Sequence, residues 1–128
     1  MTVWLARAVV LAIRARQIAE HGGGEGLRDS NVLESALARP QQLEAYGGDS
    51  VDIAALAASL AFGIAKNHAF VGGSKRTSLA TTETFLSDNG YELAADDAAC
   101  VEAWIRLGAG DFSEVDFAKW LRLHIRRA

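Results

Sequence analysis

One short segment of the sequence gathers residue types that could bind an anion and move a proton. Residues 67–77 read Asn-His-Ala-Phe-Val-Gly-Gly-Ser-Lys-Arg-Thr. Gly72 and Gly73 allow the backbone to turn tightly and to approach a ligand closely. A helix that begins near Ser74 would direct its free first-turn amides at one point, which is a typical binding site for an anion such as phosphate.

Charged side chains in the segment strengthen this interpretation. Lys75 and Arg76 would lie in the first turn of the helix, where the helix dipole disfavours a cation by about 0.3–1 kcal/mol. A bound anion would make the energy of these cations favourable instead. His68 could face the same anion as a general base, and Phe70 would anchor the segment to the core. The segment is not a P-loop, because GxxxxGK[ST] requires glycine where Ser74 stands.

A purely structural interpretation also fits this spacing. Glycine loops between helices occur in many folds, and such a loop can carry a hydrogen-bonded histidine before it and solvated cations after it. On spacing alone, the anion site and the structural loop both remain open.

Residue types that bind metals are too few and too scattered to predict a metal site. His21, His68 and His124 are far apart, and no HxxxH or HExxH spacing occurs. The single cysteine, Cys100, excludes an internal disulfide and a cysteine-based zinc site. His21 and His124 are instead predicted to lie at helix ends.

Two helices are predicted to position the segment. Residues 52–67 are small or apolar on nearly every face, which indicates a buried central helix. Residues 74–88 place Leu79, Thr82, Phe85 and Leu86 inward and end at Asn89-Gly90, a typical left-handed helix terminus.

The rest of the chain is predicted to be helical as well, apart from a short strand over residues 91–93. Apolar periodicity, N-cap residues and breakers predict four further helices: residues 3–20 before Gly22, a helix from Asp29 or Ser30 closed by Pro40, a helix from Asp96 or Asp97 stopped by Gly108-Ala-Gly110, and a last helix from Ser113 that includes Ile125. We therefore predict one all-α domain over residues 1–128, a bundle of six or seven helices.

Composition and charge limit the function. The chain has 128 residues, of which 50% are hydrophobic and 23% charged, and this balance excludes intrinsic disorder. The net charge of −3 argues against direct binding to nucleic acid, which usually requires a basic excess. The apolar stretch over residues 3–13 is interrupted by Arg7 and is too short to span a bilayer. We expect a soluble, cytoplasmic protein.

The segment also resembles the signature of the Fic/Doc family, HxFx(D/N/E)(A/G)N(K/G)R. His68, Phe70, Gly73, Lys75 and Arg76 match that signature. Four flanking stretches are similar to the death-on-curing (Doc) branch of the family: residues 21–29, residues 33–40, residues 62–65 and residues 85–91. The resemblance extends from about residue 5 to the end of the chain.

The resemblance implies a toxin of a toxin–antitoxin pair. Doc toxins use ATP and a magnesium ion to phosphorylate a threonine of elongation factor Tu, and a Phd-like antitoxin folds as a helix into a groove of the toxin. His68 would accept the threonine proton, while Lys75 and Arg76 would neutralise the nucleotide phosphates. The amides near Gly73 and Ser74 would form the anion hole, with Phe70 as the structural anchor of the motif.

Four positions bear on which chemistry the resemblance implies. Gly72 stands where the family has an acidic or amide residue that holds the metal, so no protein ligand for magnesium is evident. Ser74 replaces an asparagine, and Arg14 replaces a histidine usual in Doc proteins. Leu79 stands where adenylyltransferases of the family have a second arginine, which disfavours adenylyl transfer. We predict a Doc-like phosphotransferase with impaired catalysis. The alternatives are a Fic-type adenylyltransferase and a non-catalytic module that binds the antitoxin.

Overall fold

The computed structural model describes residues 1–22, 30–66 and 74–128. Within these ranges the fold is carried by six α-helices, and a 3-10 turn and two short strands complete it. This confirms the predicted all-α bundle. The elements, in chain order, are α1 (Arg7–His21), α2 (Ser30–Gly47), η1 (Gly48–Ser50), α3 (Ile53–Lys66), α4 (Ser74–Asp88), β1 (Tyr91–Leu93), α5 (Asp97–Ala109), α6 (Glu114–His124) and β2 (Ile125–Arg127).

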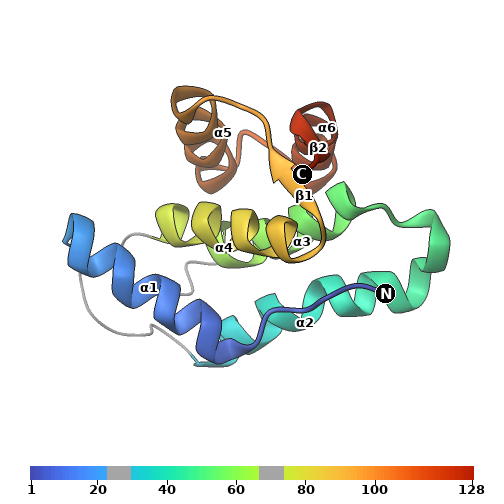
Figure 1. Ribbon diagram of the computed structural model, residues 1–128, viewed down its shortest axis with the longest axis horizontal. Coiled ribbons are helices and arrows are strands. Elements are labelled where there is room, and N and C mark those ends of the chain that lie inside the picture. The colour runs from blue at the N-terminus through green and yellow to red at the C-terminus, as the bar shows by residue number, and fades with distance from the viewer. Residues whose placement is uncertain (23–29, 67–73) are drawn as a thin grey trace.

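Helix α3 lies at the centre of the bundle, as its small and apolar residues predict. Figure 1 shows α3 and α4 in a middle layer, with α1 and α2 on one side and α5 and α6 on the other. Helix α3 contacts α2, α4, α5 and α6. Its Gly63 lets α2 come close, because a Cβ there would lie 3.0 Å from Cα of Ala36. Small side chains therefore allow close helix packing.

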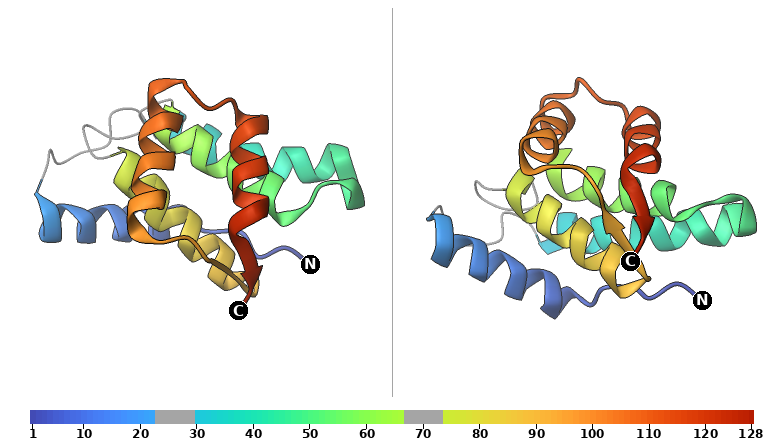
Figure 2. Two further views of the ribbon diagram at one scale, coloured as in Figure 1. Left: turned by 90° about the horizontal axis from the view of Figure 1, so that it is seen from above. Right: turned by 45° about the horizontal axis from the view of Figure 1, so that its top comes forward.

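Side-chain caps begin α5 and α6, which form the upper layer in Figure 1. Asp96 accepts a hydrogen bond from the amide of Ala99 at 2.8 Å, and Ser113 accepts one from the amide of Asp116 at 3.0 Å. These caps, which the sequence predicted, satisfy amides that have no partner inside the helix. Helices α5 and α6 then run side by side across the top of the bundle (Figure 2).

Aromatic rings pack α5 against α6, and one buried hydroxyl connects α5 to α4 and α3. Trp104 packs edge-on against Phe117 with ring centroids 4.8 Å apart, and both rings are buried. The indole Nε1 of Trp104 donates to Oγ of Ser78 at 2.9 Å, and that hydroxyl donates to the carbonyl of Ala61 at 2.9 Å. The Ser78 hydroxyl therefore connects α3, α4 and α5.

Two predicted helix ends are wrong. Pro40 lies inside α2, which continues to Gly47. Proline removes one helical hydrogen bond, but Pro40 is buried and Leu43 beyond it packs against the core, so packing outweighs that loss. The last helix ends at His124, because Ile125 begins β2 and pairs with Leu93 of the predicted strand.

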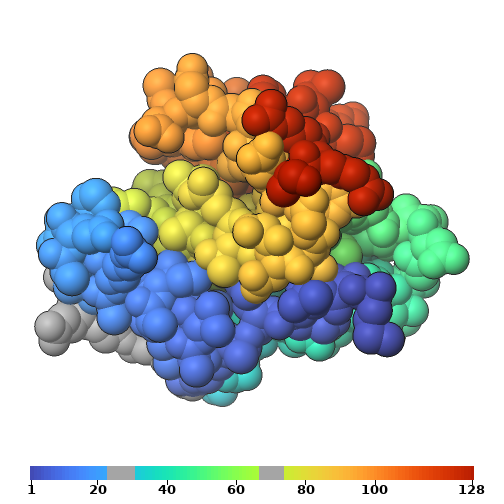
Figure 3. Space-filling model, in the orientation of Figure 1, coloured from blue at the N-terminus to red at the C-terminus, as the bar shows by residue number. Residues whose placement is uncertain are grey.

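The first helix begins later than predicted, at Arg7 rather than residue 3. The preceding segment is held along α4 instead. Trp4 stacks on Phe85 with ring centroids 5.8 Å apart, and the amide of Val3 donates to Oδ1 of Asn89 at 2.7 Å. Figure 3 shows this segment and α1 along one side of α4. None of the described helices is long and apolar enough to cross a membrane.

Candidate functional site

The first turn of α4 carries the predicted anion-binding residues that the structure describes. The helix spans Ser74–Asp88, as predicted. Ser74 is 5% exposed and Thr77 is fully buried, whereas Lys75 and Arg76 are exposed. The buried residues fix the rotation of the helix, so the two cations face outward from its positive end. His68, Phe70, Gly72 and Gly73 lie outside the described residues, and their roles stay predictions.

Arg14 of α1 is a third cation at this place. Helix α1 packs against α4, and Arg14 is 5% exposed. Burial, followed by the positive charge of Arg76, lowers the pKa of Arg14 below its ordinary value. The two guanidinium groups are therefore close enough to repel each other. Sequence reasoning noted Arg14 only as a departure from the family pattern, because nothing local in the sequence places it beside Arg76.

Two glycines at the C-terminal end of α5 make room for two lysines. A Cβ on Gly108 would lie 2.8 Å from Cδ of Lys75, and a Cβ on Gly110 would lie 2.9 Å from Nζ of Lys66. The helix ends within the predicted Gly108-Ala-Gly110 run: Gly108 lies in the last turn of α5, and Gly110 is the left-handed C-cap. The negative end of the α5 dipole favours cations at this position. Lys66, the last residue of α3, is a site residue that sequence reasoning missed.

These four cations, Arg14, Lys66, Lys75 and Arg76, form what we call the cationic end of α4. Among the described residues, no ion pair involves Lys66, Lys75 or Arg76. Like charges gathered around the positive end of a helix raise the local potential, and an anion with several negative oxygens would lower the energy of all of them together. A phosphate chain has this chemistry.

Metal-binding chemistry is not supported by the described ranges. They contain no group of three or more His, Cys, Asp or Glu residues placed to hold a metal ion. His21 and His124 are the last residues of α1 and α6, which confirms their prediction as helix ends. The Nδ1 atom of His124 lies 2.7 Å from the carbonyl oxygen of Trp120, and the two rings stack.

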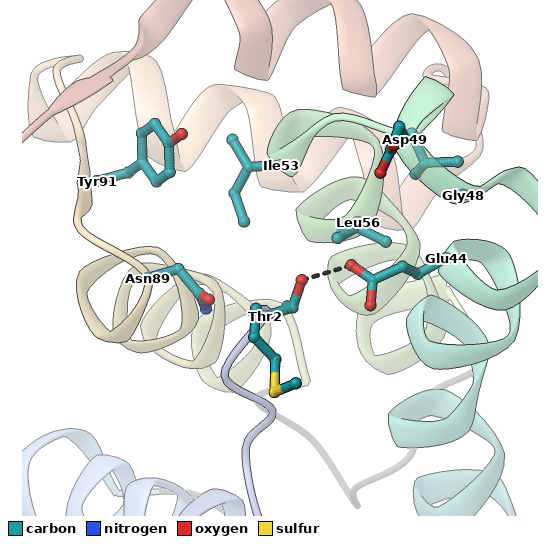
Figure 4. Close-up of a pocket in the computed structure, with 10 residues that line it drawn as sticks. Thr2, Glu44, Gly48, Asp49, Ile53, Leu56, Asn89 and Tyr91 are labelled. Carbon is teal, nitrogen blue, oxygen red and sulfur yellow. Dashed lines mark hydrogen bonds between the residues drawn. The ribbon is translucent and has the colours of Figure 1, made fainter.

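A pocket of about 610 Å³ lies at the opposite end of α4 (Figure 4). Its polar groups hold the N-terminal segment: the hydroxyl of Thr2 donates to Glu44, and Asn89 donates to the carbonyl of Val3 at 2.9 Å. The carboxylates of Glu44 and Asp49 line the pocket and would repel a phosphate. The cationic end is therefore the better candidate for an anionic substrate.

Comparison with known proteins bears on the same region. The model of the Fic/DOC family matches residues 4–86, about two thirds of the chain, including α1, α3 and the cationic first turn of α4. The chain belongs to the Fic/DOC family. A family member named Toxin Doc, from Mycolicibacterium smegmatis, is 45% identical over 97 residues, which make up 75% of this chain and 72% of the relative. Protein kinase doc of Escherichia phage P1 is 26% identical over 113 residues, 88% of each chain.

Proposed function

We propose that this chain is the toxin of a toxin–antitoxin pair and a Doc-type phosphotransferase with impaired catalysis. Its proposed substrates are ATP and a threonine of elongation factor Tu, which places its action in the cytoplasm. Membership of the Fic/DOC family and the names Toxin Doc and Protein kinase doc support the toxin and the kinase parts of the proposal. The observation that carries it is the cationic end of α4, where four positive charges suit a triphosphate.

The proposed transfer assigns one task to each group. The hydroxyl oxygen of the threonine forms a bond to the γ-phosphorus of ATP, the bond between that phosphorus and the β–γ bridging oxygen breaks, and ADP leaves. His68 takes the hydroxyl proton, a role implied by the family signature. Lys75 and Arg76 stabilise the charge that develops on the transferred group and on ADP. Arg14 adds a third positive charge, which its burial makes more effective.

Magnesium fits this chain poorly. The metal would supply charge neutralisation on the phosphate oxygens when bound. Gly72, however, provides no carboxylate where the family has an acidic or amide residue, and the described residues contain no group of three or more His, Cys, Asp or Glu side chains placed to hold a metal ion. No step of the transfer is therefore assigned to the metal. Ser74 keeps a hydroxyl that can bond a phosphate oxygen, so Gly72 is the more serious change.

Incubation with ATP, magnesium and elongation factor Tu, followed by intact-mass analysis of the factor, tests the proposal. We expect slow, incomplete phosphorylation by this chain and faster phosphorylation by the Gly72→Asp variant. Ser74→Asn is tested separately, because Ser74 is buried and a larger side chain there can disturb α4. Complete phosphorylation by the unchanged chain would overturn impaired catalysis. An adduct with the mass of an adenylyl group would identify the Fic-type adenylyltransferase instead.

The missing acidic residue at Gly72 favours one second function, a non-catalytic module that binds a Phd-like antitoxin. Calorimetric titration separates the two functions. Binding of ATP that weakens when Lys75 and Arg76 are replaced supports the phosphotransferase. Tight binding of the antitoxin without any binding of ATP supports the module.

A further inference from the structure

Helix α5 has a second apolar face that the bundle does not cover. Its inner face is buried, whereas Val101 and Ile105 on its outer side are each 52% exposed. With the exposed Ala98 they form a stripe at positions i, i+3 and i+7, which we call the α5 stripe. A shallow hollow of about 540 Å³ follows the stripe, and it is lined by Asp97, Ala98, Val101, Glu102, Ile105 and Arg106.

The charges beside the α5 stripe are predominantly negative. Asp97 and Glu102 line the hollow, and Asp96 precedes it. Partial burial and the charge of Asp97 raise the pKa of Glu83, which shows that α4 brings a further carboxylate close. In the described part of the chain, none of these four carboxylates forms an ion pair.

Arg106 is the one cation among the residues that line the hollow, so it balances only part of this charge. It lies over the ring of Phe112 at 4.1 Å from the centroid, toward the end of α5 that is remote from Asp96 and Asp97. The hollow thus joins two exposed aliphatic side chains with an excess of negative charge.

We propose that the α5 stripe docks a basic amphipathic helix of a partner protein. The partner helix would place apolar residues at i and i+3 or i+4 against Val101 and Ile105, since helices pack through ridges of that spacing. Lys or Arg residues flanking its apolar face would meet Asp97 and Glu102, and this complementarity selects a basic partner over an acidic one. An anionic lipid surface is disfavoured by the same carboxylates.

A second copy of this chain is a poorer occupant. Among the described residues, Leu123 is the most exposed branched aliphatic side chain, 82% exposed near the end of α6 with basic neighbours. The neighbouring cations are already engaged, because Arg122 pairs with Asp52 at 2.5 Å and Arg126 pairs with Glu92 at 2.6 Å. Using them at the α5 stripe would require breaking pairs within the chain.

The α5 stripe does not depend on the proposed enzymatic function. Helix α5 spans Asp97–Ala109, beyond the residues 4–86 that match the Fic/DOC model. None of the three stripe residues belongs to the cationic end of α4. Replacing them is therefore expected to leave any phosphotransferase activity unchanged.

Binding of synthetic peptides to the full chain tests the proposal. The probe, the lysine peptide, is a fluorescent helical peptide of about 18 residues with leucines along one face and lysines beside them. The control, the glutamate peptide, has the same sequence with glutamate in place of every lysine. Fluorescence anisotropy gives each dissociation constant at low and high salt. The stripe variant is Val101→Ser with Ile105→Ser. The matched control, Val115→Ser with Leu123→Ser, removes two aliphatic side chains that are 66% and 82% exposed elsewhere.

We expect the stripe variant to weaken binding of the lysine peptide about tenfold and the control variant to leave it unchanged. Asp97→Asn with Glu102→Gln should weaken binding a few-fold and reduce its salt dependence. Equal loss in the stripe and control variants, or equal binding of the glutamate peptide, would overturn the proposal. Concentration-dependent dimerisation that the stripe variant abolishes would assign the surface to a second copy and overturn the partner helix.

Discussion

The polar groups at the two ends of α4 have different roles. At the C-terminal end, the amide of Asn89 donates to the carbonyls of Val3 and Phe85 at 2.9 and 2.8 Å, and its oxygen accepts from the amide of Val3. At the N-terminal end, Lys75 and Arg76 form no ion pair among the described residues, and Arg76 repels the buried Arg14. One end uses polar groups to hold the fold, and the other keeps charge available for a ligand.

The largest expected effect comes from the cationic end. In a Gly72→Asp background, Arg76→Ala should lower the rate of phosphoryl transfer at least about 100-fold, because the developing charge loses a direct partner. The free energy of unfolding should change by less than about 0.5 kcal/mol, since Arg76 is exposed. Initial rates and urea unfolding measure both. Arg16→Ala, an exposed arginine of α1, is the control, and an equal loss in both variants would contradict a special role for Arg76.

In the middle of α4, a substitution should lower the stability of the fold. Ser78→Ala leaves the buried indole nitrogen of Trp104 without its acceptor, so the free energy of unfolding should fall by about 1–3 kcal/mol. Urea unfolding followed by tryptophan fluorescence measures this change. Ser87→Ala, at an exposed position of the same helix, should cost almost nothing. A Ser78→Ala variant as stable as the Ser87→Ala variant would show that the buried hydroxyl does not join the layers.

Arg14 tests whether the buried cation serves a ligand. Inorganic triphosphate should raise the melting temperature of the unchanged chain, because the anion binds only the folded state. Arg14→Met should weaken triphosphate binding about tenfold, or about 1.4 kcal/mol, and so reduce the rise in melting temperature. Arg7→Met removes a cation from the same helix at its other end and should keep the full rise. An undiminished rise in Arg14→Met would exclude Arg14 from the site.

Gly108 should separate stability from binding. Gly108 lies in the last turn of α5, where alanine favours the helix by up to about 1 kcal/mol relative to glycine. The added Cβ would lie 2.8 Å from Cδ of Lys75, so the lysine must move away from its position at the cationic end. Gly108→Ala should therefore be at least as stable as the unchanged chain but bind triphosphate a few-fold more weakly. Unchanged affinity would show that the place of Lys75 beside Gly108 does not matter.

The smallest effect is expected at a purely structural ion pair. Hydrogen bonding to Arg122 is the main cause that lowers the pKa of Asp52. Because the folded pKa lies below the ordinary value of about 3.9, the pair stabilises the fold above that pH and loses this effect as the pH falls through the folded pKa. The pair is half exposed, so it contributes less than about 1 kcal/mol. In the Asp52→Asn variant, the free energy of unfolding, measured by urea unfolding at a series of pH values, should fall less steeply as the pH is lowered. The same steepness in both proteins would contradict this.

Local signals in the sequence predicted the elements best. The bounds of α4 follow from its apolar spacing and from Asn89-Gly90, and the caps at Asp96 and Ser113 follow from residue type. Two local signals gave wrong helix ends. Pro40 predicted that α2 would end, and apolar periodicity predicted that the last helix would include Ile125, but contacts with distant residues outweighed both signals. The core that covers α2 beyond Pro40 and the strand that pairs with Ile125 become visible only in the folded chain.

The sequence by itself determined the types of residue at the candidate site. Glycines, a helix start and two adjacent cations within residues 72–76 are enough to indicate an anion, because the relevant forces act within one turn of a helix. Only the tertiary structure decided that Arg14 from α1 and Lys66 from α3 join them. Helix packing brings together residues that are far apart in sequence, and it decides which of the chain's many exposed charges act on the same point in space.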